Sequence, residues 1–424
     1  MKLMHPHTRF AALSSSLLAL SSISSLQGGE FDYVEAPLDS AVPAAAPDAF
    51  QWLTPSIDIR ARFEYRDQDG LDPSTSVTGR ARLGLTLGDF GGFSGFVEGE
   101  FTGVANNDFR SNPATSPSTF PNVAGNTVIA DPSNAELNRA WVQFKKNGFL
   151  AKVGRQRIIR NDAFFIGNVG WRQNEQTFDA AQIGFSNDDF NVSYVYSDRA
   201  IRIFGQGAAG ALGEFTGDFH FIDLDFKTEL GKVGGYAYLI DVDNNGNVGE
   251  SNTFGAFANL GPVYLEAAYQ EGTSNLAGGD YDSLAARAKY TLKTDAGDFS
   301  AGIDWTEDDF KTPFQTAHAP FGYADAFLLQ QIGLNKANGF DGIFNAHLKY
   351  TKKGLPGGLV FKGALHYFAN EDLSESYGYE ADMVLVKKFN DNLTGLLKAA
   401  YFVGDGSSTF PDIRQVTVDL GYKF

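Results

Sequence analysis

Hydrophobic and polar residues alternate along most of this chain. From position 56 to position 424, segments of about ten to fourteen residues carry an apolar side chain at every second position. The first such segment places on one face Ile57, Ile59, Ala61, Phe63 and Tyr65. A period of two belongs to a β-strand that buries one face, because successive side chains point to opposite sides. The pattern therefore predicts an all-β fold.

The gaps between these segments alternate between short and long. Short gaps lie at 88–92, 146–148, 187–189, 260–262 and 390–392. Long gaps lie at 105–134, 159–175, 200–217 and 308–340. Strands that cross a membrane up and down, with tight turns on one side and open loops on the other, produce this order. A soluble β-sandwich gives no reason to sort its loops in this way.

The segments predict about eighteen strands. Their expected spans are 56–66, 76–88, 93–104, 135–146, 148–158, 176–187, 189–199, 218–230, 232–242, 252–260, 262–272, 281–294, 297–307, 341–353, 357–370, 376–389, 391–404 and 411–424. An even number places both chain ends on the side of the short turns, which is periplasmic in bacterial barrels. We therefore predict a transmembrane antiparallel β-barrel with short periplasmic turns and long extracellular loops.

The two faces of the strands indicate which side meets lipid. Opposite the apolar face of the first strand lie Asp58, Arg60, Arg62, Glu64 and Arg66. This face is too charged to be only a solvated exterior, and the pattern offers no helices to cover the apolar one. We expect lipid outside and water inside. The sheet must then close, because an open edge in lipid leaves backbone groups without hydrogen bonds.

The composition excludes several classes of protein. The formal net charge of -17 argues against nucleic acid binding, which requires many Lys and Arg. The chain contains no cysteine, so disulfides do not hold it together. No run reaches the roughly 18 apolar residues of a spanning helix. A closed strand ladder needs neither a disulfide nor a helical anchor.

The amino terminus predicts export. Residues 1–28 combine a basic start with a moderately apolar stretch and small residues, which is typical of a signal peptide. Residues 29–55 carry four prolines and an alanine run, so we expect a flexible periplasmic lead-in. The barrel would then occupy residues 56–424, in an outer membrane with its lipid and lipopolysaccharide. We expect the aromatic last residue, Phe424, to be recognised by barrel-assembly machinery.

A barrel of eighteen strands has a lumen wide enough for an aqueous channel, so some segment must narrow it. The loops at 159–175 and 308–340 are rich in aromatic residues, which water-exposed loops rarely are. The aromatic residues are Phe164, Phe165, Trp171, Phe314, Phe321, Tyr323 and Phe327. Folding into the lumen would bury them. Both loops are therefore predicted to constrict the channel.

Cationic residues on the polar faces are candidates for solute selection, because rings of Arg and Lys select anions in pores. The wall contributes Arg60, Arg62, Arg80, Arg82, Arg139, Lys152, Arg287 and Lys289. A second group, at or just after the fifth strand, contains Arg155, Arg157, Arg160 and Arg172. Strict alternation would place Arg155 on the lipid side with Val153, so a bulge or the strand end must turn it inward.

Carboxylates on the same faces support a different interpretation. If the turn at 88–92 centres near Phe90, Arg80 lies opposite Glu100 and Arg82 opposite Glu98. The cations would then form neutralised cross-strand pairs that only line the wall. Both interpretations stay open from sequence alone.

Motifs for metals or catalysis are weak. Asp241, Asp243 and Asn245 resemble the start of a calcium loop, but Asn252 stands where a bidentate acid is required. The histidines are scattered singly, and no Ser/His/Asp set is recognisable. The sequence predicts no cofactor, no metal site and no enzymatic activity.

One block resembles a known family. Gly154-Arg155-Gln156, Gly167 to Asn174 and Thr177-Phe178-Asp179 resemble the alginate export family of outer-membrane barrels. The Arg-x-Arg strands at 60–65 and 80–85 and the stretch 320–325 fit it as well. The resemblance implies a monomeric eighteen-stranded barrel whose Arg-lined constriction passes an anionic polyuronate. It places Arg155, Arg172 and Asp179 at the constriction, with Arg60, Arg62, Arg80 and Arg82 along the wall.

Three functions are compatible with these features. The first is a diffusion channel for anionic or polar solutes such as acidic sugars, in which fixed cations raise the local anion concentration. The second is an export pore for an alginate-like polysaccharide, acting within a secretion complex. The third, from another class, is a non-conducting surface or adhesion barrel, which zero conductance in a bilayer would reveal.

Overall fold

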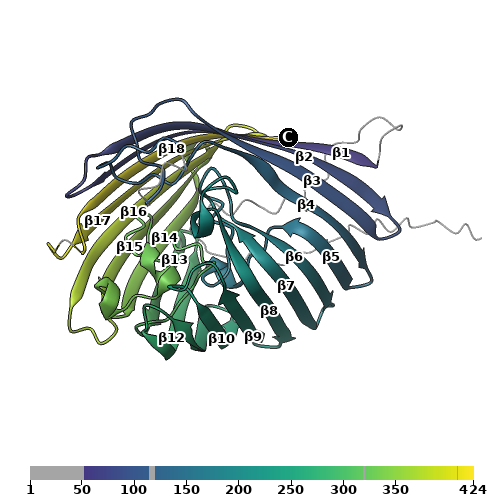
Figure 1. The fold of residues 1–424 in the computed structure, drawn as a ribbon. Helices are drawn as coiled ribbons and strands as arrows, with labels where there is room; N and C mark the ends of the chain where they lie inside the picture. The colour runs from purple at the N-terminus through teal and green to yellow at the C-terminus, as the bar shows by residue number, and fades with distance from the viewer. Residues whose placement is uncertain (1–51, 114–119, 319, 408) are drawn as a thin grey trace, which may run out of the picture.

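The computed structural model describes residues 52–113, 120–318, 320–407 and 409–424. The predicted signal peptide and most of the lead-in lie outside the described residues. Within those ranges, eighteen strands form one closed antiparallel sheet, as the alternation predicted (Figure 1). The first strand begins at Leu53, three positions before the predicted start of the barrel.

The strand bounds agree with the predicted spans to within three residues at nearly every end. The strands are β1 (Leu53–Gln68), β2 (Ser74–Phe90), β3 (Phe93–Val104), β4 (Asn134–Lys146), β5 (Phe149–Gln156), β6 (Thr177–Ser186), β7 (Phe190–Ile201), β8 (Glu214–Thr228), β9 (Gly231–Val242), β10 (Glu250–Leu260), β11 (Val263–Ser274), β12 (Gly279–Thr294), β13 (Gly297–Thr306), β14 (Ile343–Leu355), β15 (Leu359–Ala369), β16 (Ser376–Lys388), β17 (Leu393–Gly404) and β18 (Ile413–Lys423).

Each strand pairs with its neighbour in sequence, and β1 pairs with β18 to close the barrel. Across this seam Phe63 faces Val418 and Arg62 faces Asp419. Phe424 extends the seam, because its backbone N–H donates to the Ile57 carbonyl at 2.8 Å. Closure gives every strand two partners, which removes the unpaired edges that lipid would penalise.

Along the chain, each connection at one end of the barrel is shorter than the connections that flank it at the other end. The connections at the end of the barrel that holds the C-terminus run from 91–92 to 389–392 and contain two to four residues each. Of the connections at the other end, the shortest is 275–278 and the longest is 307–342. The β4–β5 turn shows why short turns suffice: Asn147 (φ 51°) and Gly148 (φ 83°) both adopt the left-handed conformation that a tight hairpin requires.

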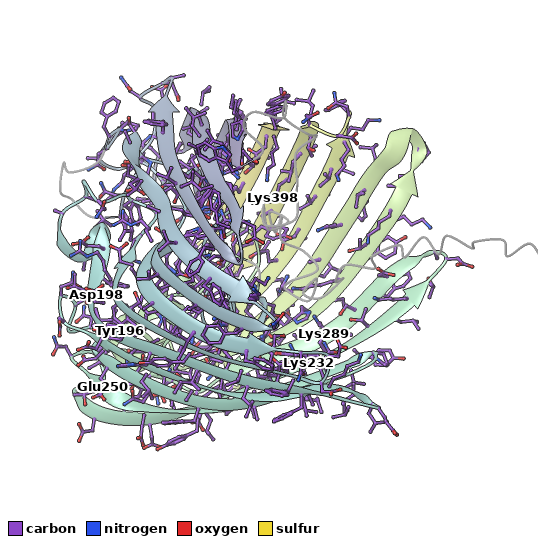
Figure 2. The ribbon with its side chains drawn as sticks, turned by 90° about the vertical axis from the view of Figure 1, so that its right-hand side faces the viewer. Tyr196, Asp198, Lys232, Glu250, Lys289 and Lys398 are labelled. Atoms are coloured by element: carbon purple, nitrogen blue, oxygen red, sulfur yellow. The ribbon has the colours of Figure 1, made fainter. Side chains whose placement is uncertain are left out.

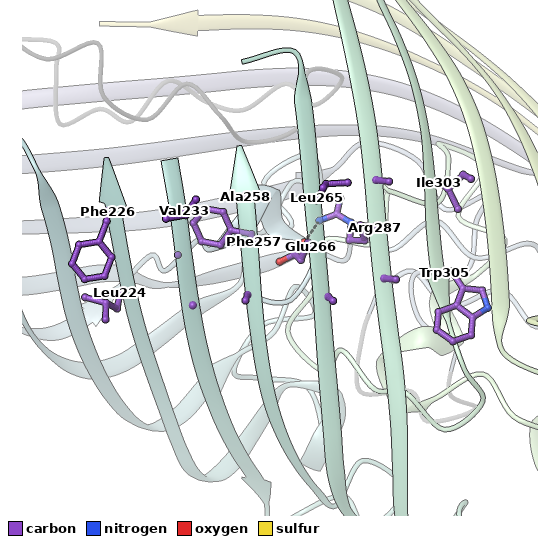
Figure 3. A pocket seen from close by; sticks show the side chains of 16 residues that line it. Leu224, Phe226, Val233, Phe257, Ala258, Leu265, Glu266, Arg287, Ile303 and Trp305 are labelled. Atoms are coloured by element: carbon purple, nitrogen blue, oxygen red, sulfur yellow. Dashed lines mark hydrogen bonds and ion pairs between the residues drawn. The ribbon is translucent and has the colours of Figure 1, made fainter. Parts of the chain in front are cut away.

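Apolar side chains form the outer surface. Exposed examples on different strands include Phe63, Val142, Leu265 and Leu348. On the outside of β8–β13, larger residues such as Leu224 and Trp305 border a shallow hollow whose floor is mainly Ala and Gly (Figure 3). In water this surface would be unfavourable, whereas in a bilayer it meets acyl chains.

In the residues that the structure describes, helical structure is limited to short 3₁₀ turns. The described residues form the 3₁₀ turns η3 (Asn161–Ala163), η4 (Gly210–Leu212), η5 (Leu328–Ile332), η6 (Lys336–Asn338) and η7 (Pro356–Gly358). In that part of the chain, no helix has the length and apolar character needed to cross a membrane.

Candidate functional site: the lumen and its inward loops

Two long loops fold into the barrel, as their aromatic content predicted. These are the β5–β6 loop (157–176) and the β13–β14 loop (307–342). All seven predicted aromatic residues in them are buried, with at most 7 % of any residue exposed. The loops also contact each other, because the Gly167 N–H donates to the Phe314 carbonyl at 2.7 Å. The lumen is therefore narrowed by two segments that pack as one unit.

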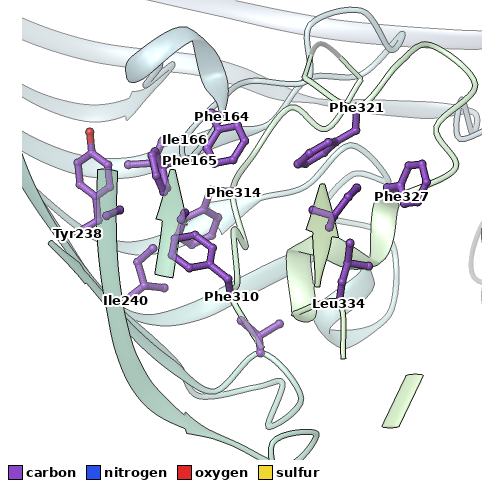
Figure 4. Packing of buried hydrophobic residues seen from close by; sticks show 14 of the residues in the cluster. Phe164, Phe165, Ile166, Tyr238, Ile240, Phe310, Phe314, Phe321, Phe327 and Leu334 are labelled. Carbon is purple, nitrogen blue, oxygen red and sulfur yellow. The ribbon is translucent and has the colours of Figure 1, made fainter. Parts of the chain in front are cut away.

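An aromatic cluster holds these loops against the wall formed by β6–β9 (Figure 4). Phe314 is fully buried, and its ring centre lies 4.9 Å from that of Phe219 and 5.2 Å from that of Phe178. Phe165 packs in the same way against Tyr236 at 5.2 Å. Here the inner face of the barrel is apolar, which corrects the expectation of a polar inner face throughout. The reason is that the loops supply apolar partners for the inner face of these strands.

The wall formed by β1–β4 is charged, and its arginines pair with carboxylates. Arg82 pairs with Glu100, and Arg139 forms a fork with Glu98 at 2.9 and 3.0 Å. Arg80 pairs with Asp58 at 2.6 Å. Cross-strand pairing was predicted, but with other partners. An irregularity between Leu87 and Phe90 moves the β2–β3 turn to 91–92, so that Arg82, not Arg80, lies opposite Glu100.

Other arginines attach the loops to this wall. Arg60 donates from Nε to the Gln173 side chain at 2.9 Å, and its guanidinium also contacts the carbonyls of Gly170 and Arg172. Arg172, from the loop, donates to Glu64 of β1 at 3.0 Å. Burial would raise the pKa of Asp131, in the β3–β4 loop (105–133), but the charges of Arg172 and Arg62 hold it below its usual value.

The charges in this region nearly balance. Seven arginines lie among eight carboxylates, and Lys423 also pairs with one of these, Asp58, at 3.6 Å. The arginines are Arg60, Arg62, Arg80, Arg82, Arg139, Arg157 and Arg172, and the carboxylates are Asp58, Glu64, Glu98, Glu100, Asp131, Glu175, Asp325 and Asp419. The wall arginines among them are at most 6 % exposed. These arginines therefore join the wall and the loops through buried ion pairs, and they do not form a ring of cations exposed to the lumen.

A histidine marks the meeting point of both loops and the wall. The His318 ring stacks on Trp171 at 3.6 Å and on Tyr323 at 4.6 Å. Its Nε2 lies 2.5 Å from the Lys398 Nζ and its Nδ1 lies 2.9 Å from Asp325 (Figure 2 labels Lys398). Since an ammonium only donates, Nε2 accepts and Nδ1–H donates to Asp325. Burial, together with Lys398, lowers the pKa of His318 to about 3.

The tip of the β5–β6 loop keeps partly exposed charges. Arg160 pairs with Asp223 of β8 at 2.7 Å, and Asp162 pairs with Arg287 of β12 at 2.8 Å. The exposed fractions of these four side chains range from 10 to 19 %. Lys289 lies two positions beyond Arg287 on the same strand, on the same face. Arg160, Arg287 and Lys289 are therefore among the predicted cations that keep some exposure inside the barrel.

Arg155 and Asp179 are placed differently from what the resemblance implied. They form a fork at 2.7 and 2.9 Å, and Arg155 also donates to the Leu137 carbonyl. Arg155 shares its face with the outward Val153, which is 53 % exposed. Strict alternation therefore holds here, and this pair lies outside the lumen at the strand ends where the loop leaves. Arg157, by contrast, forms an inner pair with Glu175 at 2.6 Å.

Several residues of the site had no signal in the sequence. Glu175 contacts Arg82, Arg157, Asn138 and Asn168, yet no sequence pattern marks it as part of the site. Its contacts with Arg82 and Asn138 join residues far apart in the chain, which no local pattern reveals. In the described part of the chain, no group of three or more His, Asp or Glu is arranged to hold a metal ion.

Comparisons with known proteins agree with this architecture. Residues 51–196 match the family described as Alginate export. Pseudomonas aeruginosa OpdO has a TM-score of 0.62 at 15 % identity, covering 88 % of this chain and 97 % of that one. Acinetobacter baumannii OccAB4 gives 0.61 at 13 % identity, covering 89 % and 100 %. No curated protein matches the sequence.

A third structure was solved with a ligand. Pseudomonas aeruginosa OccK2 (OpdF), in complex with glucuronate, has a TM-score of 0.60 at 13 % identity, covering 88 % of this chain and 98 % of that one. At these identities the likeness concerns the fold, while the family match confirms the sequence resemblance over residues 51–196. The protein is thus a bacterial outer-membrane β-barrel with the fold of porins, and its first part matches the alginate export family.

Proposed function

We propose that this barrel is a diffusion channel for small polar solutes that carry a carboxylate, with acidic sugars as the favoured class. The observation that carries the proposal is the tip of the β5–β6 loop. There Arg160, Asp162 and Arg287 keep partial exposure inside a closed eighteen-stranded barrel. The buried arginines of β1–β4 hold this loop in place and do not themselves meet the solute.

The physical basis is a narrow water-filled passage with fixed charges of both signs. Such a lining replaces part of a solute's hydration and retains solutes whose groups match its donors and acceptors. Arginine forms two parallel hydrogen bonds with a carboxylate, and the hydroxyls of a sugar match the neighbouring carboxylates. The glucuronate in the OccK2 structure supports this solute class for a barrel of the same fold.

Recording from the purified full-length chain in a planar bilayer tests the proposal. We expect stepwise conductance in KCl, and faster entry of glucuronate than of polyglutamate chains into liposomes that contain the protein. Zero conductance under conditions where a known porin conducts would contradict a channel function. It would favour the non-conducting surface barrel.

Export of a polyuronate is the second candidate, and the match of residues 51–196 to the alginate export family favours it. The two functions differ in the size of what passes. If long alginate chains applied on the periplasmic side cross the liposome membrane as fast as glucuronate, export is the better description. We expect short uronate oligomers to block the current and long chains to be retained.

The assembly of the barrel is part of the same proposal. We propose that it works as a monomer surrounded by lipid and lipopolysaccharide, and that barrel-assembly machinery recognises Phe424. That side chain is 58 % exposed at the end of the closing seam, which supports this role. Deleting Phe424 should lower the amount of folded barrel in the outer membrane without altering the conductance of the molecules that do fold.

A further inference from the structure

Arg287 pairs with three carboxylates, and one of them comes from a loop. From β12, its Nη1 and Nη2 donate to the two carboxylate oxygens of Asp162 at 2.8 and 2.9 Å. Its other two carboxylate partners belong to the wall, namely Glu266 of β11 at 2.9 Å (Figure 3) and Asp304 of β13 at 2.8 Å. The two-oxygen fork is the geometry in which arginine binds a carboxylate ligand.

The loop segment that presents Asp162 has an unfavourable backbone conformation. Asn161, Asp162 and Ala163 have φ values of 46°, 51° and 64°, three consecutive left-handed residues without a glycine. L-residues rarely adopt this conformation in succession. It persists here because Asp162 is held by Arg287 and Arg160 by Asp223. If Asp162 lost its partner, the segment would be free to return to a more favourable conformation.

A second cation and an aromatic ring lie beside this fork. Lys289, on the same inner face, forms no hydrogen bond or ion pair with the residues that the structure describes. The Tyr264 ring lies 5.8 Å from the Lys289 Nζ and 5.8 Å from the Arg287 guanidinium carbon. Together they offer a carboxylate two cations and offer a sugar ring one flat surface.

We propose that Asp162 occupies the place of a solute carboxylate, and that an acidic sugar displaces it from Arg287 as it passes. The proposal rests on the channel function and deepens it by naming the binding group. The solute carboxylate would form the fork with Arg287 while Lys289 contacts it from the side. The sugar ring would lie against Tyr264.

Charge explains why the exchange is favoured over simple addition. Glu266 and Asp304 lie within 3 Å of Arg287, so an anion added beside Asp162 would meet three carboxylates. Replacing one carboxylate by another leaves the charge at Arg287 unchanged. A dianion such as phosphate would add a charge beside Glu266 and Asp304, so monocarboxylates are the expected class.

Blockade of the potassium current by glucuronate tests the proposal, with glucose as the uncharged comparison. Asp162→Asn removes the competing carboxylate, and asparagine accepts the left-handed conformation readily. We expect the concentration for half-blockade to fall about tenfold, equivalent to about 1.4 kcal/mol. Lys289→Gln should raise it about threefold, because one of the two cations is lost. Glucose should show no such dependence.

Asp225→Asn is the matched control, because it also removes one negative charge from the inner face of the barrel. Asp225 pairs with Lys232 of β9 at 3.0 Å, so its loss leaves both ion pairs of the β5–β6 loop tip in place. We expect it to change the half-blockade concentration by less than about twofold. An equal gain for Asp225→Asn and Asp162→Asn would overturn the displacement, since the effect would then follow net charge alone. No gain for Asp162→Asn would also overturn it.

The outcome for the channel function is read separately. If all three variants and the parent conduct KCl but glucuronate blockade is the same in each, displacement is wrong and the channel function stands. If the parent forms no pores, the channel function itself fails. The amount of heat-modifiable folded barrel on a gel checks that each variant has folded.

Discussion

The wall formed by β1–β4 and the wall formed by β6–β9 both face the lumen, yet they hold the inward loops by different interactions. On the first, Arg60 and Glu64 attach the β5–β6 loop through hydrogen bonds and ion pairs. On the second, Phe178 and Phe219 pack against Phe314 of the β13–β14 loop. Directional pairs fix the position of a backbone, whereas apolar packing excludes water with little angular preference.

The two walls also differ in what they contribute to loop docking, which is position in one case and free energy in the other. Buried ion pairs often add little net stability, because removing two charges from water offsets their attraction. Aromatic burial, by contrast, contributes stability in proportion to the area removed from water. We therefore infer that the aromatic wall supplies most of the docking free energy and that the charged wall determines where the loop lies.

The largest effect is expected on the charged side. Arg172→Ala leaves Glu64, Asp131 and Asp325 without their shared cation at a position that is 4 % exposed. We expect a loss of about 5 kcal/mol from loop docking, at the upper end for breaking a buried ion pair. Chemical denaturation, together with hydrogen exchange of residues 157–176, measures the loss.

Protonation provides the control for this variant. Lowering the pH neutralises the carboxylates left behind, so the deficit of Arg172→Ala relative to the parent at the same pH should be smaller at pH 4 than at pH 7. A loss of less than about 1 kcal/mol at pH 7 would place Arg172 among side chains with only a surface role, and the comparison of the two walls would fail.

A somewhat smaller effect is expected on the aromatic side. Phe314→Ala empties a fully buried site among four phenylalanine rings. We expect a cost of about 4 kcal/mol, typical of Phe→Ala in a packed core. Because the interaction is apolar, acid pH should not restore any of it. The same denaturation series at pH 7 and pH 4 checks both statements, and recovery at pH 4 would contradict the apolar account.

The sequence predicted the strands because their signal is local. In β1, Ile59 and Phe63 alternate with Arg60 and Arg62, and a period of two requires no knowledge of the rest of the chain. At Arg155 we expected a bulge or the strand end to turn the side chain inward, against the alternation. The β4–β5 register has no irregularity at that position, so Arg155 keeps the outward place that strict alternation gives it.

The pairs in the lumen were harder to predict. A single irregularity near Phe90 changed which carboxylate faces Arg82, and a change of two residues cannot be read from composition. The partners of Arg172 come from β1, the β3–β4 loop and the β13–β14 loop, so their meeting depends on the closed barrel itself. The inner phenylalanines of β8 were missed because their partners lie in loops.

Between pH 6.5 and 4, the smallest effect concerns His318, which belongs to the charged side although aromatic rings enclose it. Burial and Lys398 lower its pKa to about 3 from an unfolded value of 6.5. The undocked state therefore binds the proton more tightly than the docked state. The contribution of His318 to the free energy of docking is fully present above pH 6.5. It is lost as the pH falls from 6.5 toward 3, by about 1.4 kcal/mol per unit.

A substitution isolates this contribution. Asp131 and Asp325 also have lowered pKa values, because cations outweigh the effect of burial, but they add to the loss only below about pH 4. Between pH 6.5 and 4, the β13–β14 loop of the parent should loosen more steeply than that of His318→Gln. Glu380 and Asp382 accept hydrogen bonds from the backbone of this loop in both proteins, so the difference between the two profiles isolates His318. Hydrogen exchange of residues 307–342, corrected for the intrinsic rate at each pH, measures this. Parallel profiles for the two proteins would show that another group controls docking, because glutamine has no proton to gain.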